Sequence, residues 1–247
     1  MPLLKSLRRA IAVAHRVLLT IRADKRTVGL MFFVPSLLVG LFSWMFNSQA
    51  AFDKVGGRLV GLFPFVVMFL AASITTLKER RSGTLERFLT TPMRRGEFIA
   101  GYALAFAVMA LVQSGITLAF ASYVCGFDTK GNTAYLYLAA VVNALCGMSL
   151  GLLASAFAKS EFQVIQFMPA LIFPQIILGG LFVPVDQMPS ALHTVSDWLP
   201  LTHSLRAILD ITDGKPQTDI VNEILVVAAV CAGSLLLGSL TLRKRTS

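Results

Sequence analysis

Six long apolar runs constrain this chain more than any other feature of its sequence. A helix that crosses the hydrocarbon core of a bilayer needs about 20 predominantly apolar residues. Six stretches meet this requirement, and they cover residues 27–46, 59–77, 98–124, 134–157, 164–182 and 222–242. The sequence therefore predicts an all-α integral membrane protein with six transmembrane helices.

The overall composition agrees with this prediction. Of the 247 residues 55% are apolar and only 14% are charged, and the mean hydropathy is +0.72. A soluble domain carries about 25% charged residues, so this chain has too few charges to cover a water-facing surface. The net charge of +9 could indicate a nucleic-acid partner, but the basic residues lie between the apolar runs, where membrane orientation explains them.

The basic residues also predict the orientation of the chain. Seventeen of the 22 lysines and arginines lie in segments that share one side of the membrane with both termini, and five lie on the other side. Lys and Arg accumulate in cytoplasmic segments of membrane proteins. We therefore expect both termini to be cytoplasmic, in a multi-pass protein of the cell inner (plasma) membrane.

The middle of each apolar run is free of charged residues. Carriers that couple transport to an ion usually keep an ionisable residue at membrane depth. This absence argues against an ATP-independent secondary transporter or channel, which remains the alternative function. An enzyme acting on lipids is also disfavoured, because the acidic and histidine residues of the outer segment are scattered without metal-ligand spacing. The three cysteines are far apart and predict no metal site.

Two sequence segments point to helix packing and to the membrane surface. Gly147 and Gly151 form a GxxxG pattern in the fourth run, which favours close helix contact. Residues 1–26 form a separate basic segment ahead of the transmembrane domain, residues 27–247. An amphipathic helix there should lie on the inner leaflet against lipid, as an anchor or as a contact for a partner; its apolar face contains Leu3, Leu7, Ile11, Ala14, Leu18 and Ile21.

The connection between the second and third runs has the pattern of a short cytoplasmic helix. Ser82 can cap it, and Pro92 should stop it. Leu85, Phe88 and Leu89 are spaced three and four residues apart, so they form one apolar knob, and charged residues surround it. Such a knob suits insertion into a groove of a cytoplasmic protein; the alternative is that it rests on the membrane surface.

The outer segment 183–221 is long for a connection between spans. It contains two short amphipathic pieces, residues 189–199 and 202–212, and Trp198 is typical of an interfacial belt. We expect a re-entrant segment before the last span. The fifth run carries Pro169 and Pro174, so we expect it to be kinked or interrupted and to form a wall of a transport pathway.

The cytoplasmic connection resembles the signature loop of ABC-2 type transporter permeases, particularly the drug-resistance and polysaccharide exporters. That family's loop reads approximately E-x-x-x-G-T-L-E-x-L-L-x-T-P-V-x-R-x-E, followed by a glycine and a lysine. This chain has the matching run Glu79…Ser82-Gly83-Thr84-Leu85-Glu86-Arg87-Phe88-Leu89…Thr91-Pro92…Glu97…Gly101. It departs from the pattern at Phe88, Met93 and Tyr102. The six spans, the N-terminal helix and the outer segment also resemble the family's layout.

The resemblance implies a division of labour between subunits. Such permeases pair with a second copy or a sister subunit, and each cytoplasmic loop docks on one of two ATP-binding subunits. ATP and Mg are then bound by the partner, and this chain is a non-catalytic subunit without a cofactor. The sequence agrees, because it contains no G-x-x-x-x-G-K-[ST] phosphate loop. The implied docking residues are Glu79, Arg81, Gly83, Thr84, Leu85, Glu86, Arg87, Phe88, Leu89 and Pro92.

Members of this family export drugs, lipids, glycolipids or polysaccharide. An aromatic, uncharged pathway would favour a hydrophobic or amphipathic substrate. The candidate pathway residues are aromatic and glutamine side chains of the second and fifth runs: Phe63, Phe65, Phe69, Gln166, Phe167, Phe173 and Gln175. Core packing and contact with lipid are the alternatives for the aromatic residues, and interhelical hydrogen bonding is the alternative for the glutamines.

We expect Phe88→Asp to abolish copurification of the chain with an ATP-binding partner, because a charge replaces the apolar anchor of the knob. Membrane insertion should be unchanged. If the partner stays bound and its ATPase activity is still stimulated, the docking role of this loop is wrong.

Overall fold

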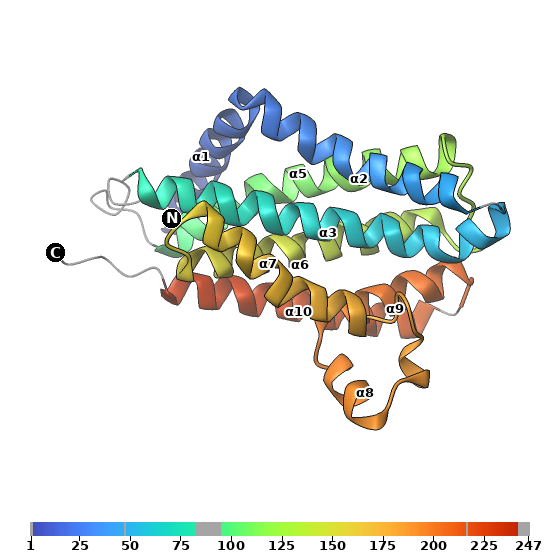
Figure 1. Cartoon of the computed structure of the whole chain (residues 1–247). Coiled ribbons are helices and arrows are strands. Elements are labelled where there is room, and N and C mark those ends of the chain that lie inside the picture. Colours follow the sequence, from blue (N-terminus) through green and yellow to red (C-terminus); the bar gives the residue numbers. More distant parts are fainter. Residues whose placement is uncertain (1, 47, 83–94, 216, 242–247) are drawn as a thin grey trace.

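The computed structural model of the chain describes residues 2–46, 48–82, 95–215 and 217–241. These residues form a bundle of helices that run along one common axis (Figure 1). Six of the helices are long and apolar enough to cross a membrane. They are α2 (Lys25–Met45), α3 (Gln49–Arg81), α5 (Arg95–Tyr123), α6 (Thr133–Phe157), α7 (Glu161–Leu178) and α10 (Gln217–Thr241). The predicted helical class and the six apolar spans are confirmed.

Three spans have bounds that differ from the prediction by four residues or more, and one of them, α10, begins at Gln217, five residues before its predicted start. Helix α3 begins at Gln49, ten residues before the predicted start; its 33 residues are about 50 Å long, well beyond a hydrocarbon core of about 30 Å. Helix α7 continues through Pro169 and Pro174 without interruption and ends at Leu178, not at residue 182. Its end is set by Gly179 and Gly180, because Gly180 has a φ of +81°, a conformation that favours glycine.

Helices α3 and α6 form the centre of the bundle, and the other spans surround them. A Cβ atom added at Gly147 or Gly151 of α6 would collide with the carbonyl oxygen of Phe65 or Phe69 on α3, respectively. The missing side chains let the two backbones approach closely, which is how small residues join helices in membranes. The packing role predicted for the GxxxG pattern is confirmed.

The outer segment contains η1 (Val185–Gln187), α8 (Ser190–Ser196) and α9 (Pro200–Thr212), so both predicted amphipathic pieces are helical. Helix α9 buries Leu201, Leu205 and Ile208 in the bundle, whereas α8 protrudes from its side (Figure 1). Whether this segment re-enters the bilayer remains a prediction.

Asp197 holds the α8–α9 connection together. Its carboxylate accepts a hydrogen bond of 2.7 Å from Arg206 and lies 3.3 Å from the ring of His193. The bond from Arg206 is the main reason that the pKa of Asp197 lies below its usual value. The ring of His203 joins the backbone oxygen of Asp197, 2.9 Å away, to the carboxylate of Glu223 on α10.

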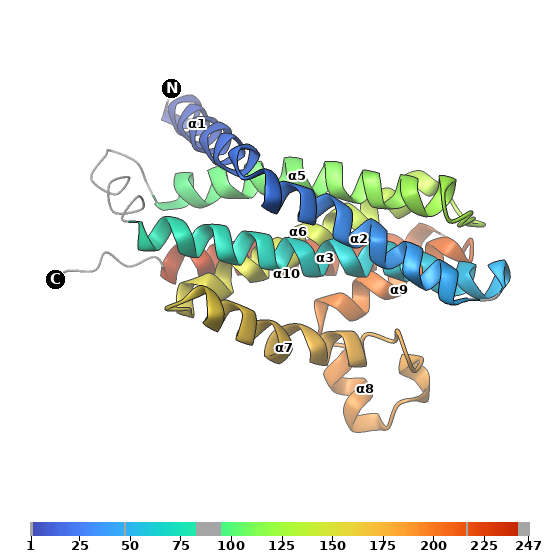
Figure 2. The ribbon, with the colours of Figure 1, turned by 45° about the horizontal axis from the view of Figure 1, so that its top comes forward.

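Helix α1 (Pro2–Ala23) leaves the bundle at an angle and packs against α5 (Figure 2). Ala14 and Ile21 of the predicted apolar face are buried against the bundle, and whether the rest of this face lies against lipid remains a prediction. The buried stripe of α1 also contains Ala10, Val13 and Val17, whereas Leu7 and Ile11 are 54% and 52% exposed. The reason is a close crossing: a Cβ atom at Gly101 of α5 would lie 2.5 Å from Cβ of Val13, so the contact is centred on that residue.

We expect Gly147→Ala to destabilise the protein by about 1–3 kcal/mol, because the added methyl group must separate α6 from α3. Gly233→Ala is the matched control, since a Cβ atom at Gly233 of α10 meets nothing within 4 Å. The stability of the two variants is compared by heating the purified proteins and measuring the folded peak in gel filtration. The midpoint is the temperature at which half of this peak is lost. Equal midpoints for the two variants would contradict the close packing of α3 and α6.

Candidate functional site

The predicted docking segment lies between α3 and α5. Glu79 and Arg81 belong to the last turn of α3, and Ser82 follows as its C-terminal cap. The other predicted docking residues lie outside the described residues: Gly83, Thr84, Leu85, Glu86, Arg87, Phe88, Leu89 and Pro92. We call the end of the bundle where α3 ends and α5 begins the inner end, because the basic bias predicts it to be cytoplasmic.

Both flanks of this segment are attached to α1 by ion pairs. Arg16 donates a hydrogen bond of 2.8 Å to Glu79 at the end of α3, and Arg9 donates one of 3.4 Å to Glu97 at the start of α5. The two glutamates are only 8% and 7% exposed. A buried carboxylate is costly unless it is paired, so these contacts fix α1 to both helices.

Two further side chains extend this network, which we call the inner cluster. Arg80 donates a hydrogen bond to the backbone oxygen of Ser155 at the inner end of α6. Tyr102 of α5 is fully buried, and its hydroxyl lies within electrostatic reach of Glu79 and Arg16. Arg81, by contrast, is exposed. The inner cluster therefore joins α1, α3, α5 and α6 at the flanks of the predicted docking segment.

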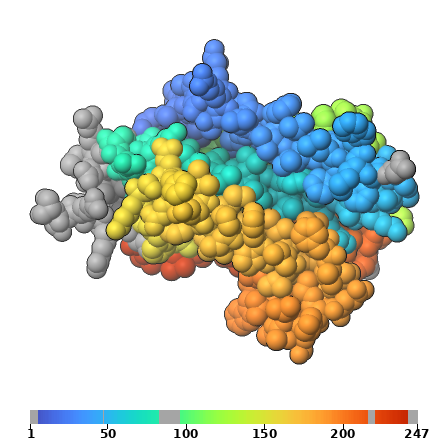
Figure 3. All heavy atoms as spheres, in the orientation of Figure 1, coloured from blue at the N-terminus to red at the C-terminus, as the bar shows by residue number. Residues whose placement is uncertain are grey.

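A groove of 590 Å³ opens beside the inner cluster. Its floor is α3, and its walls are the connection between α1 and α2 on one side and the start of α7 on the other; in Figure 3, α3 is visible between these two walls. Most of the lining surface is apolar. Half of the sixteen lining residues are apolar, and these are Ile21, Leu30, Met31, Val34, Val67, Leu70, Ala71 and Ile74. The polar lining residues gather towards the inner end: Thr20, Asp24, Thr27, Thr75, Lys78, Glu79, Ser82 and Glu161.

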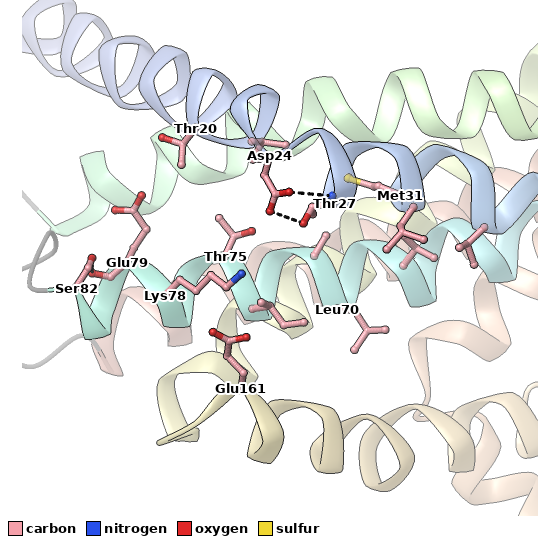
Figure 4. A pocket seen from close by; sticks show the side chains of 16 residues that line it. Thr20, Asp24, Thr27, Met31, Leu70, Thr75, Lys78, Glu79, Ser82 and Glu161 are labelled. Carbon is pink, nitrogen blue, oxygen red and sulfur yellow. Dashed lines mark hydrogen bonds between the residues drawn. The ribbon is translucent and has the colours of Figure 1, made fainter.

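Three charged side chains from three elements surround the inner mouth of the groove. Figure 4 shows Lys78 of α3 with Asp24 drawn on one side and Glu161 of α7 on the other. Asp24 caps α2, because its two carboxylate oxygens accept hydrogen bonds from the hydroxyl and the backbone N–H of Thr27, at 2.6 and 3.1 Å. The hydroxyl bond above all, then the N–H bond and the charge of Lys78, hold the pKa of Asp24 below its usual value.

Four of the aromatic residues predicted to line a pathway meet in one place: Phe65 and Phe69 belong to a buried apolar cluster, and Phe63 and Phe167 pack against it. Whether any of the seven predicted residues lines a pathway remains a prediction. The side chains of Phe65 and Phe69 on α3 are completely buried. Phe63 packs against Phe42 at 5.9 Å between ring centroids. On α7, Gln166 and Phe173 are exposed, Phe167 is half-buried, and Gln175 donates a hydrogen bond of 2.9 Å to the backbone oxygen of Leu171 on its own helix. These seven residues are not among those that line the groove.

The sequence contains a periodic pattern that marks the α3 floor of the groove. Val67, Leu70, Ala71, Ile74 and Lys78 of α3 are spaced three and four residues apart, so they share one face that ends in a charge. Phe65 and Phe69, by contrast, lie on the face of α3 that packs against α6.

Comparison with known proteins assigns the chain to a family. Residues 9–212 match the model of a family described as ABC-2 type transporter, and this range includes most of α1, the segment between α3 and α5, and the groove. The chain belongs to the ABC-2 type transporter family. It is a multi-pass membrane protein with six candidate spans, and the side of the membrane on which its termini lie remains a prediction.

This ABC-2 family member is similar to three curated proteins from different organisms. It is 31% identical to ABC transporter G family member 20 of Dictyostelium discoideum, over 67% of this chain and 23% of that protein. It is 27% identical to the linearmycin resistance permease protein LnrN of Bacillus subtilis, over 74% and 47% of the two chains. It is 26% identical to the probable multidrug ABC transporter permease YbhR of Escherichia coli, over 59% and 39%. The chain spans less than half the length of each.

We expect Arg16→Gln to reduce the stability of the protein by about 1–2 kcal/mol, because it leaves the buried Glu79 carboxylate without its ion pair. Arg22→Gln is the control, since Arg22 lies on the exposed side of α1. The double variant Arg16→Gln/Glu79→Gln should recover part of the loss in a denaturation experiment, because the unpaired buried charge is gone. Losses that simply add would show that the two residues do not interact.

Proposed function

We propose that this chain is the membrane-spanning permease subunit of an ATP-binding cassette exporter. It moves a hydrophobic or amphipathic molecule, such as a drug, lipid or glycolipid, outward across the membrane. ATP and Mg are bound and ATP is hydrolysed by a separate subunit, present in two copies, and the permease pairs with a second copy of itself or a sister chain. Membership of the ABC-2 family and the names of the relatives, which include a linearmycin resistance permease and a probable multidrug permease, support this proposal.

The observation that carries the proposal is the position of the inner cluster. Its ion pairs lie on both flanks of the segment that resembles the family's signature loop. A partner that pushes on this segment would act on α1, α3 and α5 together, because Arg16 and Arg9 join them. In this account Leu85, Phe88 and Leu89 anchor the partner, and Arg81, Glu86 and Arg87 set its register. Glu79, which the sequence predicted in the same role, is buried against Arg16 and therefore holds α3 to α1 instead.

The groove supports the choice of substrate class. Its floor is the same helix, α3, that ends at the inner cluster, so a push on the inner end of α3 moves the floor of the groove relative to α7. Helix α7 is suited to such movement, because it buries only Val164, Ile172 and Gln175. A groove with a mostly apolar lining and a charged mouth fits an amphiphile better than a highly charged solute.

Transport in reconstituted vesicles tests the proposal. The full chain is coexpressed with the ATP-binding subunit encoded nearest to it and reconstituted so that the inner end faces the external solution. A fluorescent single-chain amphiphile should accumulate only with ATP, and not when the phosphate-loop lysine of the partner is replaced. Accumulation that needs an ion gradient and no ATP would contradict the proposal and favour the secondary transporter.

A further inference from the structure

The groove has the dimensions of one leaflet of a membrane. On its α3 floor, the stretch from Val67 to the charge of Lys78 covers eleven residues of helix, which span about 16 Å. Half of a hydrocarbon core of about 30 Å is of similar length. An apolar chain that enters with its head at Lys78 would therefore reach the level of Val67, near the middle of the bilayer.

The charges at the mouth are of both signs and are not paired with one another. No ion pair within 4 Å joins Lys78, Asp24 or Glu161 to another described residue, although Lys78 is close enough to Asp24 to lower its pKa. Glu79 also lines the mouth but is held by Arg16. One positive and two negative groups are therefore available to a ligand.

This charge pattern discriminates between head groups. A purely anionic head would pair with Lys78 but be repelled by Asp24 and Glu161, and a purely cationic head would pair with the two carboxylates but be repelled by Lys78. An uncharged hydroxyl head would gain hydrogen bonds but no charge pairing. A head group with one charge of each sign can satisfy both sides of the mouth.

We propose that the mouth of the groove is a head-group subsite for a zwitterionic amphiphile. A phosphate or carboxylate of the head lies beside Lys78, its amine lies beside Asp24 and Glu161, and its apolar chain lies along α3. This inference rests on the proposed function, since it names the class of molecule that enters the groove from the inner leaflet.

Direct binding tests the subsite without the ATP-binding partner. The purified full chain in an uncharged maltoside detergent is titrated with a pyrene-labelled lysophosphatidylcholine. Alkyl phosphate, alkyltrimethylammonium and alkyl glucoside of matched chain length compete with it. The wild-type chain should prefer the zwitterionic probe.

Each charge should change the preference in its own direction. Lys78→Gln should weaken the binding of the zwitterionic probe about fivefold and make alkyltrimethylammonium a better competitor. Glu161→Gln should instead improve alkyl phosphate. Lys54→Gln, at the exposed outer end of α3, is the matched control and should leave the preference unchanged. Because Lys78 and Glu161 lie on different helices, a folding defect in one variant does not affect the test with the other.

The outcomes separate the subsite from the proposed function. Identical competitor preferences in the wild type, Lys78→Gln and Glu161→Gln would overturn the subsite, even if ATP-driven transport of amphiphiles is observed. The expected shifts in preference without any ATP-driven transport would support the subsite and contradict the exporter function.

Discussion

The close contact between α3 and α6 is the constraint on which the rest of this structure depends. Gly147 and Gly151 remove the side chains that would separate the two backbones, and α6 then covers Phe65 and Phe69. Because α6 packs tightly against it, α3 can move as one rigid helix that extends from the outer segment to the inner cluster. This helix is longer than a bilayer core requires, so its last turn carries Glu79 and Arg80 to the inner end, where they meet α1 and α6.

The inner cluster and the groove are two consequences of the same helix. On one face of α3, Glu79 is held by Arg16 and Arg80 by the backbone of α6. On another face, Val67, Leu70 and Ile74 form the floor of the groove and Lys78 forms its mouth. A displacement of the inner end of α3 is therefore a displacement of the groove floor. This geometry gives a physical link between a cytoplasmic partner and a membrane substrate.

Much of the fold could be predicted because it depends on local sequence. The number of spans followed from run length, and the packing of Gly147 and Gly151 followed from their spacing. The start of α3 was predicted ten residues late, because Gly56, Gly57 and the charges of Asp53, Lys54 and Arg58 lower the local hydropathy. Tertiary contacts stabilise the first part of α3 as a helix: Phe127 lies against Gly56, and Thr212 lies against Gly57.

The candidate site was less predictable, because its contacts join distant parts of the chain. Arg16 and Glu79 are 63 residues apart, and Arg9 and Glu97 are 88 apart; no local pattern indicates which arginines of α1 find partners. The mouth of the groove needs a helix cap, a span and the start of another span to meet at Asp24, Lys78 and Glu161. Periodicity could have identified the α3 face of the groove, but not the other two elements.

We expect α1, α3 and α5 to move as one unit while the groove between this unit and α7 changes width. Pulsed electron spin resonance can test it in the complex with the ATP-binding subunit, with spin labels on exposed positions of a variant whose native cysteines are replaced. The distance between labels at Ala12 and Ala100, on α1 and α5, should stay constant when ATP is added. The distance between labels at Thr20 and Phe162, on opposite walls of the groove, should change. If the distance between the labels at Ala12 and Ala100 changes while the distance across the groove stays constant, α1 and α5 do not move as one unit against α7.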